Sequence, residues 1–72
     1  MDIQRLIEMA NQIGDFYKSY PDQAQANIEV AGHLNRFWAL PMRKQIAQYA
    51  NDGDGSGLHA NVLAAIKAHI QV

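Results

Sequence analysis

Apolar side chains recur every three or four residues along the first part of the chain, with polar residues between them. In residues 3–17 the apolar set consists of Ile3, Leu6, Ile7, Ala10, Ile13, Phe16 and Tyr17. This spacing matches the period of an α-helix and predicts one apolar stripe on a helix over these residues. Asp2 stands at a natural N-cap position. The stretch "SYPD" ends this helix and begins the next, with Pro21 suited to a first helical turn.

A second helix of similar length follows, with an apolar stripe made of Ala24, Asn27, Ile28, Ala31, Leu34, Phe37 and Trp38. A proline disfavours helical geometry in the residue before it, so Pro41 predicts a break near residues 39–40. A third, shorter helix then places Met42, Ile46 and Tyr49 inward. It ends in the glycine-rich stretch 51–57, "NDGDGSG". The fourth helix carries Leu58, Val62, Leu63, Ile66 and Ile70.

These four segments predict an all-α fold: a small single-domain bundle of about four helices over residues 1–72. Two long helices form a hairpin, two shorter ones complete the bundle, and residues 51–57 form a flexible glycine-rich loop. The residues expected to be buried between the two long helices are Leu6, Ile13, Ile28 and Leu34. A chain of 72 residues without cysteine has no disulfides, and so small a domain is marginally stable alone. A metal, a partner or very good helix packing must supply the stability that disulfides would otherwise provide.

Charge and hydropathy narrow the function classes. The formal net charge is −1, which is not the basic balance of a general nucleic-acid binder. No apolar run approaches the length of about 20 residues that spans a bilayer, so no membrane partner is expected. The N-terminal stretch is amphipathic and does not resemble a secretory signal. We therefore expect a cytoplasmic protein.

The glycine-rich stretch raises the possibility of a calcium site. With Asp52 at position 1 of a calcium loop, Asp54 falls at position 3, Ser56 at 5 and Gly57 at 6. Position 12 needs a bidentate carboxylate, but Leu63 stands there and fits the apolar stripe of the last helix. A linking loop with a helix C-cap at its start is the favoured interpretation, and no metal site is predicted.

Other catalytic and metal-binding patterns are absent from the sequence. The histidines His33, His59 and His69 do not have the i, i+4 spacing of a helical zinc pair. A packed or capping role is favoured for His33, which lies beside the apolar face. No nucleophile elbow, phosphate-binding loop or dinucleotide fingerprint occurs. We expect no catalytic residue and no enzymatic activity from this chain alone.

The stretch "GHLNRFWALPMRKQI", residues 32–46, is the most informative part of the chain. Phe37 and the only tryptophan, Trp38, are adjacent, and adjacent helix positions point about 100° apart. Both rings therefore cannot enter one small core, and one is expected at the surface, flanked by Arg36, Arg43 and Lys44. Aromatic and arginine side chains are enriched at interface hot spots. Two alternatives remain open: both rings close the end of the bundle, or they stack on nucleic acid.

Two motifs in this order carry a resemblance to a known family. The first is "L-x-x-M-A-N-Q-I", matched by Leu6 and by residues 9–13. The second is "H-L-x-x-F-W", matched by residues 33–38 and followed by a proline, methionine and arginine group at 41–43. Residues 1 to about 46 thereby closely resemble the delta subunit of NAD-dependent, molybdenum-containing formate dehydrogenases, and the tail from Gly57 resembles it less.

The resemblance implies a non-catalytic accessory subunit. In that family the large alpha subunit carries a molybdopterin guanine dinucleotide cofactor and iron–sulfur clusters, and the beta and gamma subunits pass electrons to FMN and NAD. The expected partners are this large subunit and the beta and gamma subunits, with no cofactor on the chain itself. The predicted partner-binding residues are His33, Arg36, Phe37, Trp38, Met42 and Arg43. The alternative function is a free-standing helical regulator or a nucleic-acid-binding module.

Overall fold

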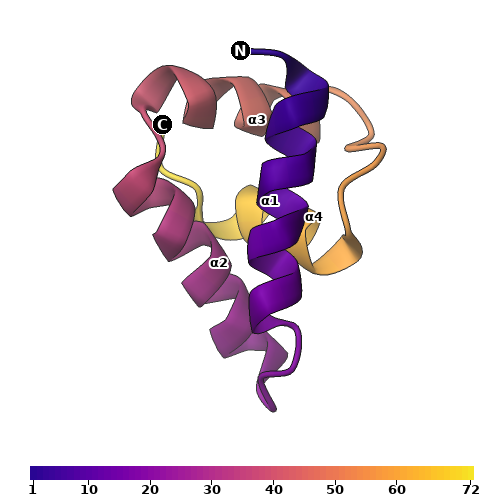
Figure 1. Ribbon diagram of the computed structural model, residues 1–72, viewed down its shortest axis with the longest axis vertical. Coiled ribbons are helices and arrows are strands. Elements are labelled where there is room, and N and C mark those ends of the chain that lie inside the picture. The colour runs from indigo at the N-terminus through magenta and orange to yellow at the C-terminus, as the bar shows by residue number, and fades with distance from the viewer.

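The chain folds into four helices and no strand (Figure 1). Helix α1 covers Ile3–Tyr17, α2 covers Gln23–Phe37, α3 covers Leu40–Asp52 and α4 covers Ala60–His69. The computed structural model describes all residues from 1 to 72. None of its helices has the length and apolar character needed to cross a membrane. The predicted all-α class with about four helices is therefore confirmed.

Two aspartates set where the first two helices begin. The Asp2 carboxylate accepts a hydrogen bond from the backbone N–H of Gln4 at 3.1 Å, so the predicted N-cap of α1 is confirmed. The Asp22 carboxylate caps α2 in the same way and accepts from the N–H of Ala24 at 3.0 Å. Pro21 lies before this cap, so its predicted place in the first turn is wrong. A carboxylate that satisfies free N–H groups defines the start of a helix better than a nearby proline does.

Helices α1 and α2 form the two arms of a V that is closed by the turn at residues 18–22 (Figure 1). Helix α3 crosses the open end of the V, and α4 lies behind the arms in this view. The most extensive helix packing is between α2 and α4. The expected hairpin of the two longest helices is present, but its arms splay apart and α4 packs against one of its two faces.

The main core lies where all four helices meet. Its nine buried members are Leu6, Ile7, Ala10, Leu34, Trp38, Ile46, Ala50, Val62 and Ile66. Helix α1 approaches α4 closely at Gly14, where a Cβ atom would collide with Cγ2 of Val62. The side-chain amide of Asn61 donates to the Gly14 carbonyl at 3.3 Å in the same place. The glycine near the C-terminal end of α1 therefore has a packing role.

The predicted inner face of the second helix is wrong in part. Leu34 is fully buried as expected, but Ile28 is 48% exposed. Helix α2 instead buries the side that contains Ala26 and Val30, because its main neighbour is α4 and small side chains allow two helices to approach closely. On α1, Leu6 is buried as predicted and Ile13 is only partly buried.

The segment between α3 and α4 is held on α1 by one asparagine. The Asn11 side-chain amide donates to the carbonyl of Gly57 at 2.9 Å, and its oxygen accepts from the backbone N–H of His59 at 2.9 Å. Gly55 and Gly57 have φ values of 67° and 90°, a region that favours glycine. Helix α3 extends to Asp52, so the non-helical segment begins at Gly53. The flexibility expected for this loop stays a prediction.

Candidate partner-binding surface

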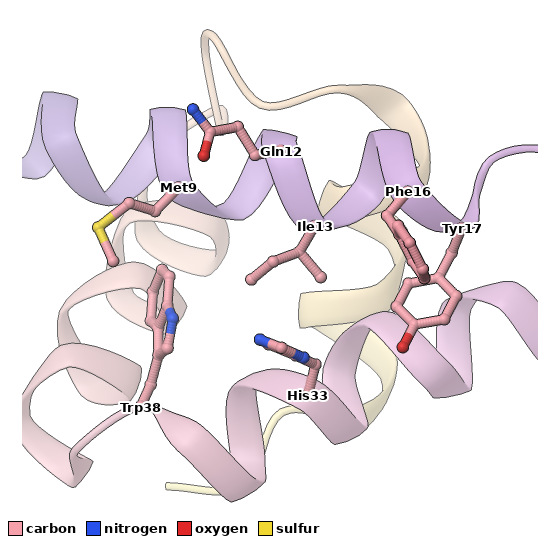
Figure 2. A pocket seen from close by; sticks show the side chains of 7 residues that line it. All are labelled: Met9, Gln12, Ile13, Phe16, Tyr17, His33 and Trp38. Carbon is pink, nitrogen blue, oxygen red and sulfur yellow. The ribbon is translucent and has the colours of Figure 1, made fainter.

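A groove of about 430 Å³ lies between α1 and α2, on the side of the V that faces away from α4 (Figure 2). Five of its seven lining residues come from α1, one from α2 and one from the corner after α2: Met9, Gln12, Ile13, Phe16, Tyr17, His33 and Trp38. Figure 2 shows Met9 and Trp38 at one end of the groove and Phe16 and Tyr17 at the other. The two arms therefore leave an apolar surface on the face that α4 does not cover.

Trp38 forms one end wall of the groove and belongs to the core as well. It is the C-cap residue of α2, with extended backbone geometry, and its backbone N–H donates to the Leu34 carbonyl at 2.9 Å. Only 6% of its surface is exposed. The nitrogen-bearing edge of its indole points into the groove, toward His33 (Figure 2). The extended backbone turns this ring inward at the point where the helix ends.

Phe37, unlike Trp38, lies outside the core and is 69% exposed. Its ring lies 4.8 Å from the ring of His33, centroid to centroid, and the Arg36 guanidinium lies 5.7 Å from its centroid. We call His33, Arg36 and Phe37 the Phe37 cluster. The prediction that only one of the two adjacent rings enters the core is confirmed, with Trp38 inside and Phe37 outside.

Arg43 and Met42 serve the domain's own packing. The Arg43 guanidinium reaches back from α3 and donates to the carbonyls of Asn35 at 2.7 Å and Trp38 at 3.1 Å. It thereby satisfies carbonyl groups at the end of α2, which have no partner within the helix. Met42 is partly buried against the core. Of the six predicted partner-binding residues, the Phe37 cluster is therefore the part that presents an aromatic and cationic surface.

The α1 wall of the groove was not among the predicted site residues. Phe16 is 74% exposed although the stripe on the first helix placed it inward. It packs edge-to-face on Tyr17 at 5.0 Å, and Tyr17 packs in the same way on Tyr20 at 5.3 Å. Phe16 and Tyr17 are adjacent aromatics, as Phe37 and Trp38 are. The reasoning that placed one ring of the second pair outside applies equally to the first pair.

The family model described as the NADH-dependent formate dehydrogenase delta subunit matches residues 5–66, which include both motifs and all seven groove residues. The chain belongs to this family. No curated protein and no solved structure matches it. The groove thus brings together Met9, Gln12 and Ile13 of the first motif with His33 and Trp38 of the second.

The residues of the possible calcium loop have other contacts. The Asp54 carboxylate accepts from the backbone N–H of Ser56 at 2.9 Å, and Asp52 lies in the last turn of α3. Leu63 packs over Gly55, where a Cβ atom would contact its side chain. No group of three or more His, Cys, Asp or Glu side chains in the structure is placed to hold a metal ion.

The three histidines lie in separate parts of the fold. His33 lines the groove. Nδ1 of His59 lies 3.1 Å from a carboxylate oxygen of Asp15, the one contact within salt-bridge distance in the molecule. His69 ends α4, and its carbonyl accepts a hydrogen bond from the Asn35 side chain at 3.1 Å. These positions give each histidine a packing or tethering contact rather than a shared site.

Proposed function

We propose that this chain is a non-catalytic accessory subunit of a cytoplasmic, NAD-dependent formate dehydrogenase. It binds the large, molybdenum-containing subunit and supports the assembly or stability of the active complex. The family match supports a place in the enzyme. The observation that carries the docking role is the Phe37 cluster, an exposed aromatic ring with a cation over it beside an apolar groove.

The exposed aromatic residues fit a protein interface better than a free surface. Phe16 and Phe37 are 74% and 69% exposed; Phe16 lines the groove, and Phe37 contacts the lining residue His33. Aromatic and arginine side chains dominate binding energy at interfaces, where they fill desolvated sites on the partner. A small domain with a limited core also gains stability from a partner that binds only its folded state. Binding and mutual stabilisation are therefore expected together.

In this proposal the redox chemistry belongs to the other subunits. The chain has no cysteine, so it has no thiolate to ligate an iron–sulfur cluster. The molybdopterin guanine dinucleotide cofactor, the clusters, FMN and NAD are assigned to the alpha, beta and gamma subunits. The contribution of this chain is the surface that it presents to the large subunit.

The test compares two exposed apolar residues on different sides of α2. Phe37→Ala removes the ring of the cluster, and Ile28→Ala removes a side chain that is 48% exposed. The two positions are nine residues apart, which places them about half a turn from each other around the helix. Both variants should keep a wild-type circular-dichroism melt, because neither side chain is in the core. The matched pair separates the loss of a specific surface from a general change in apolar area.

Phe37→Ala should weaken binding to the purified large subunit by about 30- to 800-fold, the equivalent of about 2–4 kcal/mol for a truncated aromatic anchor. It should also lower the formate-dependent NAD reduction of the assembled complex. Ile28→Ala should bind and support activity as the wild type does. If the two variants bind equally well, the Phe37 cluster is not the interface.

A further inference from the structure

The polar groups of the groove between α1 and α2 indicate what it binds. Trp38 is 94% buried, and its indole N–H, which can only donate, has no hydrogen-bond partner within the chain. This edge of the ring points into the groove (Figure 2). The buried polar side-chain atoms without a partner are Oδ1 of Asn27 and Nε of Arg43, so the indole nitrogen is open to the groove. A bound group that covered this donor without accepting from it would leave it unsatisfied, which costs free energy. The group that fills the groove should therefore carry an acceptor at this end.

The charges around the groove favour an acidic acceptor. None of the seven lining side chains carries a carboxylate, whereas Gln12, Tyr17 and His33 can donate hydrogen bonds. Arg36 belongs to the Phe37 cluster, whose His33 lines the groove, and no carboxylate lies within salt-bridge distance of its guanidinium. A carboxylate would accept from the indole, and the neighbouring Phe37 cluster supplies positive charge. Hydrogen bonds to charged acceptors are also the stronger ones.

The shape of the groove fits a helix. Its α1 wall runs from Met9 to Phe16, which is about 10 Å or two helical turns at 1.5 Å per residue. Ile13 lies on the wall between these two residues, in the middle of the groove (Figure 2). On the other face of the same V, α4 already packs across both arms. An amphipathic helix with its apolar side in a groove is a common mode of recognition.

We propose that this groove takes a short amphipathic helix of the large subunit, which places apolar side chains against Met9 and Ile13. A carboxylate of this helix accepts a hydrogen bond from Nε1 of Trp38. This inference rests on the proposed function, because it names the feature of the large subunit that the surface recognises. The groove then adds specificity to the anchor that Phe37 provides.

A charge series at Gln12 tests the sign of the bound charge. Gln12 is exposed at the rim of the groove and takes no part in the hydrogen bonds of its neighbour Asn11, so its substitution leaves the fold intact. Gln12→Glu should weaken binding to the purified large subunit by about fivefold or more, and Gln12→Lys should strengthen it. Gln48→Glu makes the same charge change at an exposed position of α3 outside the groove and should have no effect. The opposite order of affinities would show that the bound segment is basic and would overturn the proposal.

A second test removes only the indole donor. Trp38 is the only tryptophan, so biosynthetic replacement of tryptophan by 3-benzothienylalanine exchanges its N–H for sulfur at this position alone. The melt should stay close to that of the wild type, because the donor has no partner within the chain. Affinity for the large subunit should fall by about tenfold or more, as expected for a lost hydrogen bond to a charged group. Unchanged affinity would overturn the assigned contact.

The outcomes separate this inference from the proposed function. If Phe37→Ala lowers the affinity for the large subunit while the Gln12 series and the indole replacement leave this affinity unchanged, the chain docks on the large subunit without using the groove. In that case the inference fails and the proposed function stands. If the wild-type chain does not bind the large subunit at all, both fail. A photo-crosslinker at position 12 should label an acidic, helical segment of the large subunit, and labelling of a basic segment would overturn the inference.

Discussion

Two glycines in helix interiors give a matched test of how closely α1 and α4 pack. Gly14 lies in α1 and Gly32 in α2. A glycine in a helix costs about 0.5–1 kcal/mol relative to alanine, so substitution by alanine alone would stabilise both helices equally. The surroundings differ. A Cβ at Gly32 would meet only the Arg36 guanidinium at 3.6 Å, whereas a Cβ at Gly14 would overlap Cγ2 of the fully buried Val62.

The helix-propensity term cancels when the two variants are compared, which leaves the overlap with Val62. Overpacking of this kind costs about 1–3 kcal/mol. Gly32→Ala should therefore raise the free energy of unfolding by about 0.5–1 kcal/mol. The free energy of unfolding of Gly14→Ala should be about 1–3 kcal/mol lower than that of Gly32→Ala. In a domain of this size each kcal/mol shifts the melting temperature by about 4–8 °C. Circular-dichroism melts and urea titrations of both variants measure the difference.

A double variant shows whether Val62 is the cause. Val62→Ala removes the methyl group that the new Cβ would strike, at the cost of a small cavity. In that background Gly14→Ala should become stabilising, so the two changes should couple with a favourable interaction energy. If Gly14→Ala in the wild-type chain stabilises as much as Gly32→Ala, the close contact between α1 and α4 is wrong.

Three further predictions concern the core and the loop. Leu34→Ala should cost about 2–5 kcal/mol in a circular-dichroism melt, since Leu34 is fully buried; an unchanged melt would contradict its place in the core. Asn11→Ala should speed hydrogen exchange of the His59 backbone N–H more than Asn11→Asp does, because aspartate keeps the oxygen that accepts from this N–H. Equal exchange rates in the two variants would argue against the hydrogen bond from His59 to Asn11. Melting curves recorded with calcium and with a chelator should overlay, because Leu63 stands where the loop needs a carboxylate; a rise in melting temperature with calcium concentration would show a site.

The helical period of the sequence predicted the number of helices and most of the core, because the spacing of the apolar residues shows which side of each helix is apolar. It did not predict which neighbour that side would face. Ile28 was assigned to the interior by its spacing, but α4 packs on the Ala26 and Val30 side of α2 instead. Small side chains give a weak apolar signal in the sequence even though they allow the closest helix packing.

Part of the candidate site could be predicted from the sequence, and part depended on how the helices pack. The adjacency of Phe37 and Trp38 was enough to place one ring outside, since neighbouring helix positions diverge. The role of Arg43 could not be predicted, because its hydrogen bonds to the end of α2 depend on how the corner before α3 is turned. The α1 wall, including Phe16, was missed because an apolar residue in a helical stripe was assigned to the core.

The most direct measurement of the central claim is capture of the assembled enzyme through this chain. An affinity-tagged chain is expressed in its natural host and purified gently, and the eluate is assayed for the large formate dehydrogenase subunit, for molybdenum and for formate-dependent NAD reduction. The proposed function predicts a stoichiometric large subunit, molybdenum and activity with the wild-type chain and with Ile28→Ala, and their loss with Phe37→Ala. A folded wild-type chain that elutes without the large subunit and without activity would contradict the account.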